Sequence, residues 1–124
     1  LAINTSSTLI SIKRLLTFNG NPLILDFIKI PAVSFRGLSA EKVIEKNGSM
    51  YRMYETDFGI QMLRADEKIK AVAANNESSS MLNVSENAPL LSVERLSYTY
   101  DDKPIEWRLG LCVTLDHYYK TELE

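Results

Sequence analysis

The sequence predicts an α+β fold with one antiparallel sheet and flanking helices. The first observation is a long β-hairpin at 90–112, in which two runs of β-branched, aromatic and aliphatic residues surround the polar turn 101–104. Pro104 stands where the second run begins, a position that does not need its missing backbone donor. The second observation is that the chain contains this hairpin twice. The third is that short helical patterns, not parallel crossover units, connect the strand patterns.

The repeat is visible when Leu1 is placed on Leu82, an offset of 82 − 1 = 81. LAINTSSTLISIKRL then lies over LNVSENAPLLSVERL without a gap, and one extra residue later the turn 19–22 superposes on the turn 101–104. Two copies are too few for a solenoid, so the pattern predicts one domain, 1–124, with internal pseudo-two-fold symmetry. Because Leu82 ends a helical pattern, we expect an equivalent helix before Leu1 and a chain that begins inside a domain. The identical pairs are Leu1/Leu82, Leu9/Leu90, Ser11/Ser92, Arg14/Arg95 and Leu15/Leu96.

The first hairpin is predicted from residues 9–18 and 23–30. Asn19-Gly20 between them is a strong hairpin-turn signal. Pro31 ends the second strand because it cannot continue the backbone ladder.

Two helices are predicted next. Ser39 can cap a short helix that continues to about Lys46. Ser49 is a good N-cap for a second helix, whose apolar residues recur at helical spacing until Gly59 supplies a natural stop.

The remaining elements are less regular. Residues 60–74 predict a strand with a bulge or bend, because the charged cluster 66–68 interrupts the alternation. Asn75 or Asn76 then caps a short helix. Residues 115–123 predict a last strand.

The composition excludes several classes of function. With 14 basic and 16 acidic residues, the formal net charge is −2, and no basic block offers a footprint for nucleic acid. The single Cys112 cannot form an internal disulfide, and a single histidine, His117, leaves no zinc spacing. No apolar run approaches the roughly 18 residues that span a bilayer, and no signal peptide opens the chain. We therefore expect a protein of the reducing cytoplasm without a metal, a cofactor or a membrane partner.

Nucleophilic catalysis finds little support in the sequence. His117 lies five residues after Cys112 and no third partner is evident. On one continuous strand, residues separated by an odd number face opposite sides. We expect a packed Cys112 and a surface His117.

One constellation favours an anion site. The helix start at Ser49 offers free backbone N–H groups, with Tyr51 in its first turn. Arg14 lies on a central strand with apolar neighbours on its face, so its guanidinium must meet a carboxylate, a phosphate or a ligand. Glu106 and Asp57 are the internal candidates. The residues alone leave open plain helix capping by Ser49, an internal salt bridge of Arg14 and a core or rim position for Tyr51.

Several motifs, in this order, resemble a known family. They are Ser49-x-Tyr51, the stretch 71–84, the run APLLSVERLSYTYDDKPIEW and Asp116-x-Tyr118. Together they are similar to the UTRA domain, the effector-binding half of HutC-type regulators in the GntR family of bacterial transcription factors. The resemblance implies a chorismate-lyase-like fold, a symmetric dimer, and a small-molecule pocket coupled to a winged helix-turn-helix domain N-terminal to the chain.

The resemblance also implies site residues. In sugar-phosphate-sensing members, an Arg-Leu-Arg strand motif grips the phosphate together with the Ser-x-Tyr helix start, and a later glutamate holds the polar body of the effector. The first arginine falls on Arg14, the serine and tyrosine on Ser49 and Tyr51, and the glutamate on Glu106.

The chain departs from that pattern at two positions. Leu16 stands where those members have the second arginine, so half of the positive clamp is absent. Cys112 stands where they have a tyrosine. A carboxylate or an amino-acid-like metabolite therefore joins a sugar phosphate as an expected effector. The family also closes its pocket with a loop from the portion that precedes this chain.

The leading hypothesis is a ligand-sensing and dimerisation domain that performs no chemistry. The effector would bind one conformation of the dimer better and so change how the attached domains meet operator DNA. One alternative is a lyase of the related fold, which would hold an aromatic dicarboxylate with an arginine and an acid. Another is a structural dimerisation module with a vestigial pocket.

Overall fold

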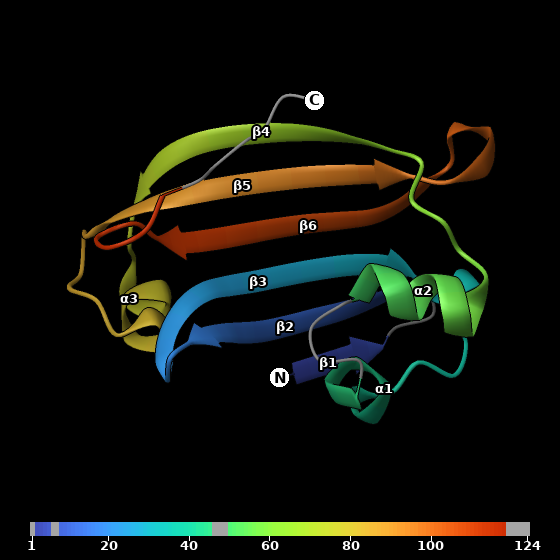
Figure 1. Ribbon diagram of the computed structural model, residues 1–124, viewed down its shortest axis with the longest axis horizontal. Helices are drawn as coiled ribbons and strands as arrows, with labels where there is room; N and C mark the ends of the chain where they lie inside the picture. Colours follow the sequence, from blue (N-terminus) through green and yellow to red (C-terminus); the bar gives the residue numbers. More distant parts are fainter. Residues whose placement is uncertain (1, 6–7, 46–49, 119–124) are drawn as a thin grey trace.

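A computed structural model describes residues 2–5, 8–45 and 50–118. The described residues form one six-stranded antiparallel sheet in the order β1-β2-β3-β6-β5-β4, with helices on its faces (Figure 1). This confirms the predicted α+β class. In chain order the elements are β1 (Ala2–Thr5), β2 (Leu9–Phe18), β3 (Asn21–Pro31), the 3-10 turn η1 (Ala32–Ser34), α1 (Ala40–Glu45), α2 (Met50–Phe58), β4 (Arg64–Ala73), α3 (Asn76–Leu82), β5 (Pro89–Tyr98), the 3-10 turn η2 (Tyr100–Asp102) and β6 (Pro104–Val113).

The two predicted hairpins lie side by side and are related by the predicted pseudo-two-fold axis. Their inner strands β3 and β6 are antiparallel, and Phe27 pairs with Leu109. These two residues differ by 109 − 27 = 82, the offset of the repeat after the turns, so the axis passes between them. Each hairpin has one register shift, after Leu16 in the first and after Ser97 in the second. Since 97 − 16 = 81, even this irregularity obeys the repeat.

The repeat does not extend to the first residues of the chain. Ala2–Thr5 form a strand paired with β2, whereas the matching residues 83–86 lie in the loop after α3. The gapless match therefore does not predict the backbone structure of this stretch, because apolar residues at the same spacing occur in strands and in loops alike. The helix expected before Leu1 lies outside the described residues.

β4 differs from the predicted bulged strand. It pairs with β5 without interruption from Arg64↔Tyr98 to Ala73↔Pro89. A bulge is not needed, because β4 is an edge strand whose residues are almost all exposed, so charged residues can point to either face. The first residues of the predicted strand, among them Ile60 and Met62, instead pack on the core before β4 begins.

The other boundaries follow local signals. α1 and α2 form where predicted, and Gly59 has a φ of +67°, as a helix stop in the left-handed region requires. Asn75 caps α3 in a capping box with Ser78. The predicted last strand is wrong for residues 115–118, which leave the sheet after β6, while residues 119–123 lie outside the described chain.

The helices cover opposite faces at opposite ends of the sheet. α1 and α2 lie over the end where β2 begins, and α3 lies at the other end (Figure 1). The first cluster includes Ile12 of β2, Ile28 of β3 and Tyr54 of α2, and the second joins Leu25 of β3 to Leu82 of α3. Leu25 and Ile28 of β3 are an odd number of residues apart, so the two clusters lie on opposite faces of the sheet. Because α1 and α2 lie over only one end of their face, the rest of that face carries no helix of the described residues (Figure 1). No helix of the described residues is long and apolar enough to cross a membrane.

Candidate functional site

The half of the sheet face beside α2 contains a cavity of about 230 Å³. Its lining residues come from β2, β3, β5 and β6. On each strand they are two residues apart, so they point to the same face of the sheet. The backbone register places Arg14 opposite Asp26 and Arg95 opposite Arg108. The lining residues are Arg14, Leu16, Ile24, Asp26, Val93, Arg95, Arg108, Gly110 and Cys112.

Glu106 does not itself line this cavity, but it binds Arg108, which does. Its carboxylate is 1% exposed and accepts two hydrogen bonds from Arg108, from Nε at 3.0 Å and from Nη2 at 2.8 Å. Tyr54 donates to it at 2.7 Å and Tyr51 at 3.2 Å. A buried carboxylate requires such partners, and the bidentate geometry fixes the plane of the guanidinium. Glu106 therefore holds Arg108 in place and joins α2 to the sheet.

The two arginines of the second hairpin remain charged in this environment. Burial opposes the charge of Arg108, but the negative charge of Glu106 outweighs it and raises the arginine pKa. Arg95 donates to the Tyr51 hydroxyl at 3.1 Å and, through Nε, to Glu67 of β4 at 2.8 Å. Burial opposes its charge too, while Tyr51 and Glu67 raise its pKa. Nη1 of Arg108 makes no hydrogen bond to a described residue, so a donor is left at the cavity.

Arg14 has a different internal partner from the two predicted. Its Nε donates to Asp26 at 3.0 Å, and both residues are buried, at 7% and 4% exposure. The hairpin register brings Asp26 directly opposite Arg14, whereas Glu106 is on β6 and Asp57 on α2. Arg14 is thus an internal ion pair that also lines the cavity.

The remaining candidates are placed as follows. Tyr51 sits over the arginines, with the Arg108 guanidinium 5.1 Å from its ring centroid. Leu16 and Cys112 line the cavity wall. Ser49, the predicted cap of α2, lies outside the described residues. Burial and the nearby Asp26 raise the pKa of the Cys112 thiol, which keeps it protonated at neutral pH.

Cys112 and His117 do not face opposite sides as predicted. Both line an adjoining cavity of about 140 Å³, because the strand ends at Val113 and the chain then turns back. His117 also packs edge-on against Phe18, with ring centroids 5.9 Å apart. Within the described residues, no group of three histidine, cysteine or acidic side chains is arranged to hold a metal ion.

Sequence reasoning missed three of the charged residues in this cavity: Asp26, Arg95 and Arg108. A signal for the two arginines was present. Arg95 is the repeat equivalent of Arg14, and Arg108 follows Glu106 by two residues and so shares its face. Although position 16 is leucine, Arg95 and Arg108 of the second hairpin therefore supply positive charge to the cavity.

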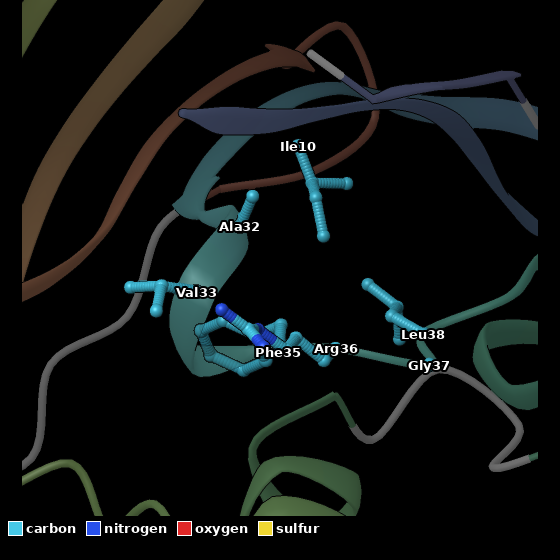
Figure 2. Close-up of a pocket in the computed structure, with 7 residues that line it drawn as sticks. All are labelled: Ile10, Ala32, Val33, Phe35, Arg36, Gly37 and Leu38. Atoms are coloured by element: carbon cyan, nitrogen blue, oxygen red, sulfur yellow. The ribbon is translucent and has the colours of Figure 1, made fainter. Parts of the chain in front are cut away.

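A second cavity, of about 300 Å³, lies beneath the start of β2 and has a different character. Figure 2 shows Ile10 and Leu38 pointing toward one another across it, near Phe35. Arg36 is the one charged side chain among its described lining residues. It offers little with which to orient a polar ligand, so we assign the candidate site to the arginine-lined cavity.

The buried tyrosine of the network gives a testable pH dependence. Burial, the charge of Glu106 and the hydrogen bond to it raise the pKa of Tyr54 well above the ordinary 10.0. Above about pH 10 the unfolded chain loses this proton while the folded chain keeps it, so stability should fall by up to about 1.4 kcal/mol per pH unit. In urea unfolding between pH 8 and 10.5, the free energy of unfolding of Tyr54→Phe should decrease less steeply with pH than that of the wild type. Tyr100→Phe, at an exposed position, is the control and should keep the wild-type slope.

Comparison with known proteins places this geometry in a family. The UTRA domain model matches residues 1–118. The ligand-binding domain of a regulator assigned to the GntR family of Bordetella bronchiseptica is 42% identical, with a TM-score of 0.87 over 95% of this chain and 75% of that chain. The effector domain of PhnF from Mycobacterium smegmatis shares the fold, with a TM-score of 0.81 at 22% identity over 98% of this chain and 73% of that chain.

Two curated relatives are longer regulators. The HTH-type transcriptional repressor PhnF of Mycolicibacterium smegmatis is 25% identical over 111 residues, which cover 90% of this chain and 44% of PhnF. The HTH-type transcriptional regulator Rv0792c of Mycobacterium tuberculosis is 36% identical over 56 residues, 45% of this chain and 21% of that protein. The chain spans less than half the length of these relatives. From the family match and the 42% identical structure, the chain belongs to the UTRA domain family, and its fold is that of the effector domains of GntR-family transcription regulators.

Proposed function

We propose that this chain senses a small anionic metabolite for a bacterial transcription regulator, and that the metabolite binds in the arginine-lined cavity. The observation that supports this best is the convergence of Arg14, Arg95 and Arg108 on one cavity of about 230 Å³. Arginine presents a planar fork of donors that suits carboxylate and phosphate groups. A cavity of this size, below the roughly 300–1,000 Å³ of drug-sized sites, suits a small metabolite.

The proposed site keeps the residues expected from the sequence and refines their contributions. Ser49, outside the described residues, stays a contact proposed from the sequence, and Tyr51 of α2 accepts a hydrogen bond from Arg95 through its hydroxyl. Glu106 acts mainly by holding Arg108, because its oxygens accept hydrogen bonds from the protein itself. Arg14 contributes positive charge at the back of the cavity.

Leu16 and Cys112 form the apolar part of the same site. Neither supplies a charge, so they shape the space beside the anion and contact the body of the ligand. The effector class proposed on this basis comprises sugar phosphates, carboxylates and amino-acid-like metabolites.

The proposal extends to the complete regulator. We infer that it is a cytoplasmic homodimer in which a winged helix-turn-helix domain N-terminal to this chain binds operator DNA. The relative PhnF is a transcriptional repressor, which supports a regulatory role for ligand binding here. A ligand changes DNA binding only if it binds the two conformations of the dimer with different affinity. Sedimentation of the full-length protein at micromolar concentration tests the dimer, and a monomer contradicts it.

Replacing Arg95 tests the site most cleanly. Its side chain is 31% exposed, so Arg95→Gln should disturb the fold less than a change at the buried Arg14. Loss of a charge-assisted hydrogen bond, about 1.5–3 kcal/mol, should weaken effector binding about 10- to 150-fold in calorimetric titrations of the full-length protein.

The matched control for this experiment is Arg64→Gln. Arg64 is also a strand arginine paired with a carboxylate, Asp66, but it lies on the edge strand β4 away from the cavity. It should leave the affinity unchanged. Equal binding by wild type and Arg95→Gln would show that the anion binds elsewhere.

A further inference from the structure

We propose that the effector is a monocarboxylate with an apolar body, which lies with its carboxylate at Arg108 and Arg95 and its body against Ile24 and Cys112. This inference rests on the proposed function and narrows it from anions in general to one chemical class. It follows from the balance of charge in the cavity, from the walls beyond the arginines and from the neighbouring cavity.

The charge balance favours a single negative charge. Each arginine of the cavity already has a carboxylate partner: Arg14 has Asp26, Arg95 has Glu67 and Arg108 has Glu106. The formal charges of these six groups cancel, so the described residues of the cavity and their partners carry no excess positive charge of the kind that a phosphate dianion requires. The 5% exposed carboxylate of Asp26 in the cavity wall repels a second negative charge at short range.

One donor is available for that single charge. Nη1 of Arg108 has no hydrogen-bond partner among the described residues, while Nε and Nη2 of the same side chain hold Glu106. Arg95 lies directly opposite on β5 and can share the anion, since its bond to Glu67 is made by partly exposed side chains. A carboxylate with two oxygens matches two adjacent guanidinium groups.

The walls beyond the arginines are apolar. Leu16, Ile24 and Val93 line the cavity together with the protonated Cys112 thiol. Sugar hydroxyls in this position would lose water without gaining good partners, which costs free energy. An alkyl or aromatic group would instead gain from leaving water.

The space continues past these walls. The adjoining cavity of about 140 Å³ shares Ile24 and Cys112 with the arginine-lined cavity, and its other apolar lining residues are Leu23, Leu91 and Val113. Its polar lining residues are Thr114, His117 and Tyr118, of which the last two are exposed. Because they share these two residues, we treat the two cavities as one elongated site, with the arginines at one end and mostly apolar residues at the other.

Gly110 keeps the middle of this site open. A Cβ atom at this position would lie 3.1 Å from Oδ1 of Asp26 and 3.6 Å from Ile24. Its φ lies outside the left-handed region, so backbone conformation does not require glycine here. The residue is best explained by the space it leaves between the charged and apolar ends.

The test is calorimetric titration of the full-length regulator with hexanoate, acetate, glucose 6-phosphate and inorganic phosphate. Each buried methylene should strengthen binding about fourfold, so hexanoate should bind about 10- to 200-fold more tightly than acetate. It should also bind more tightly than either phosphate. Cys112→Phe, which fills the junction of the cavities, should weaken hexanoate binding at least tenfold and change acetate binding little.

A second variant keeps the test decisive if Cys112→Phe does not fold. Leu16→Arg adds an unpaired positive charge to the wall and should shift the preference toward glucose 6-phosphate. Glucose 6-phosphate binding to wild type at least as tightly as hexanoate, with Arg95→Gln still weakening it, overturns this inference and leaves the proposed function standing. If none of the four probes binds, this inference is overturned, and if Arg95→Gln leaves the binding of every probe unchanged, the proposed function fails as well.

Discussion

Replacing Glu106 by alanine is expected to lower the free energy of unfolding by about 3–5 kcal/mol, one of the two largest effects of a single substitution in this chain. The carboxylate is 1% exposed and accepts hydrogen bonds from Arg108, Tyr54 and Tyr51. Its loss leaves the Arg108 charge, whose side chain is only 16% exposed, without its partner. The two tyrosine hydroxyls lose their acceptor at the same time, so α2 is no longer joined to the sheet by this network.

Urea unfolding at pH 7 measures this effect, and the control is Glu77→Ala. Glu77 also forms an ion pair, with Lys13 at 2.8 Å, but the side chains are 55% and 33% exposed, so its loss should cost about 0–1 kcal/mol. Glu106→Gln keeps the shape of the side chain and one acceptor oxygen, so its loss in the free energy of unfolding should lie between those of Glu106→Ala and Glu77→Ala. A Glu106→Ala protein as stable as Glu77→Ala would show that water replaces the network.

The second large effect concerns the buried pair of Arg14 and Asp26. Replacing either residue by alanine should cost about 3–5 kcal/mol, because the remaining charge stays buried without its partner. Replacing both, as Arg14→Met with Asp26→Leu, should recover most of that loss, since apolar residues of similar volume need no partner.

A double-mutant cycle separates the coupling from the individual losses. The same four proteins, titrated with the effector, should lose affinity whenever Arg14 is absent, including in the stable double variant. Additive losses of stability in the cycle would contradict a direct pair. Full affinity in the double variant would show that Arg14 serves only the fold.

Local sequence signals account for much of the fold. The turn at Asn19-Gly20 and the matched repeat predict two hairpins with the same register, because turn geometry and the two-residue side-chain period are local properties. Helix ends at Gly59 and Asn75 follow from capping chemistry for the same reason.

Local sequence signals did not predict which strand would lie at the edge of the sheet. The charges of β4 interrupted its pattern because an edge strand buries little on either face, and this depends on which strand lies beside it. The chain beyond Val113 left the sheet although its composition suited a strand.

What the sequence by itself determined is the set of elements, the internal repeat and the presence on strands of charged residues that must find partners. Only the tertiary structure decided which partners they find: Asp26 for Arg14, Glu106 for Arg108 and Glu67 for Arg95. The physical reason is that a side chain's face follows from its own strand, whereas its neighbour follows from strand order and register across the whole sheet. The arginine-lined cavity exists because the pseudo-two-fold axis brings two hairpins, far apart in the chain, onto one face.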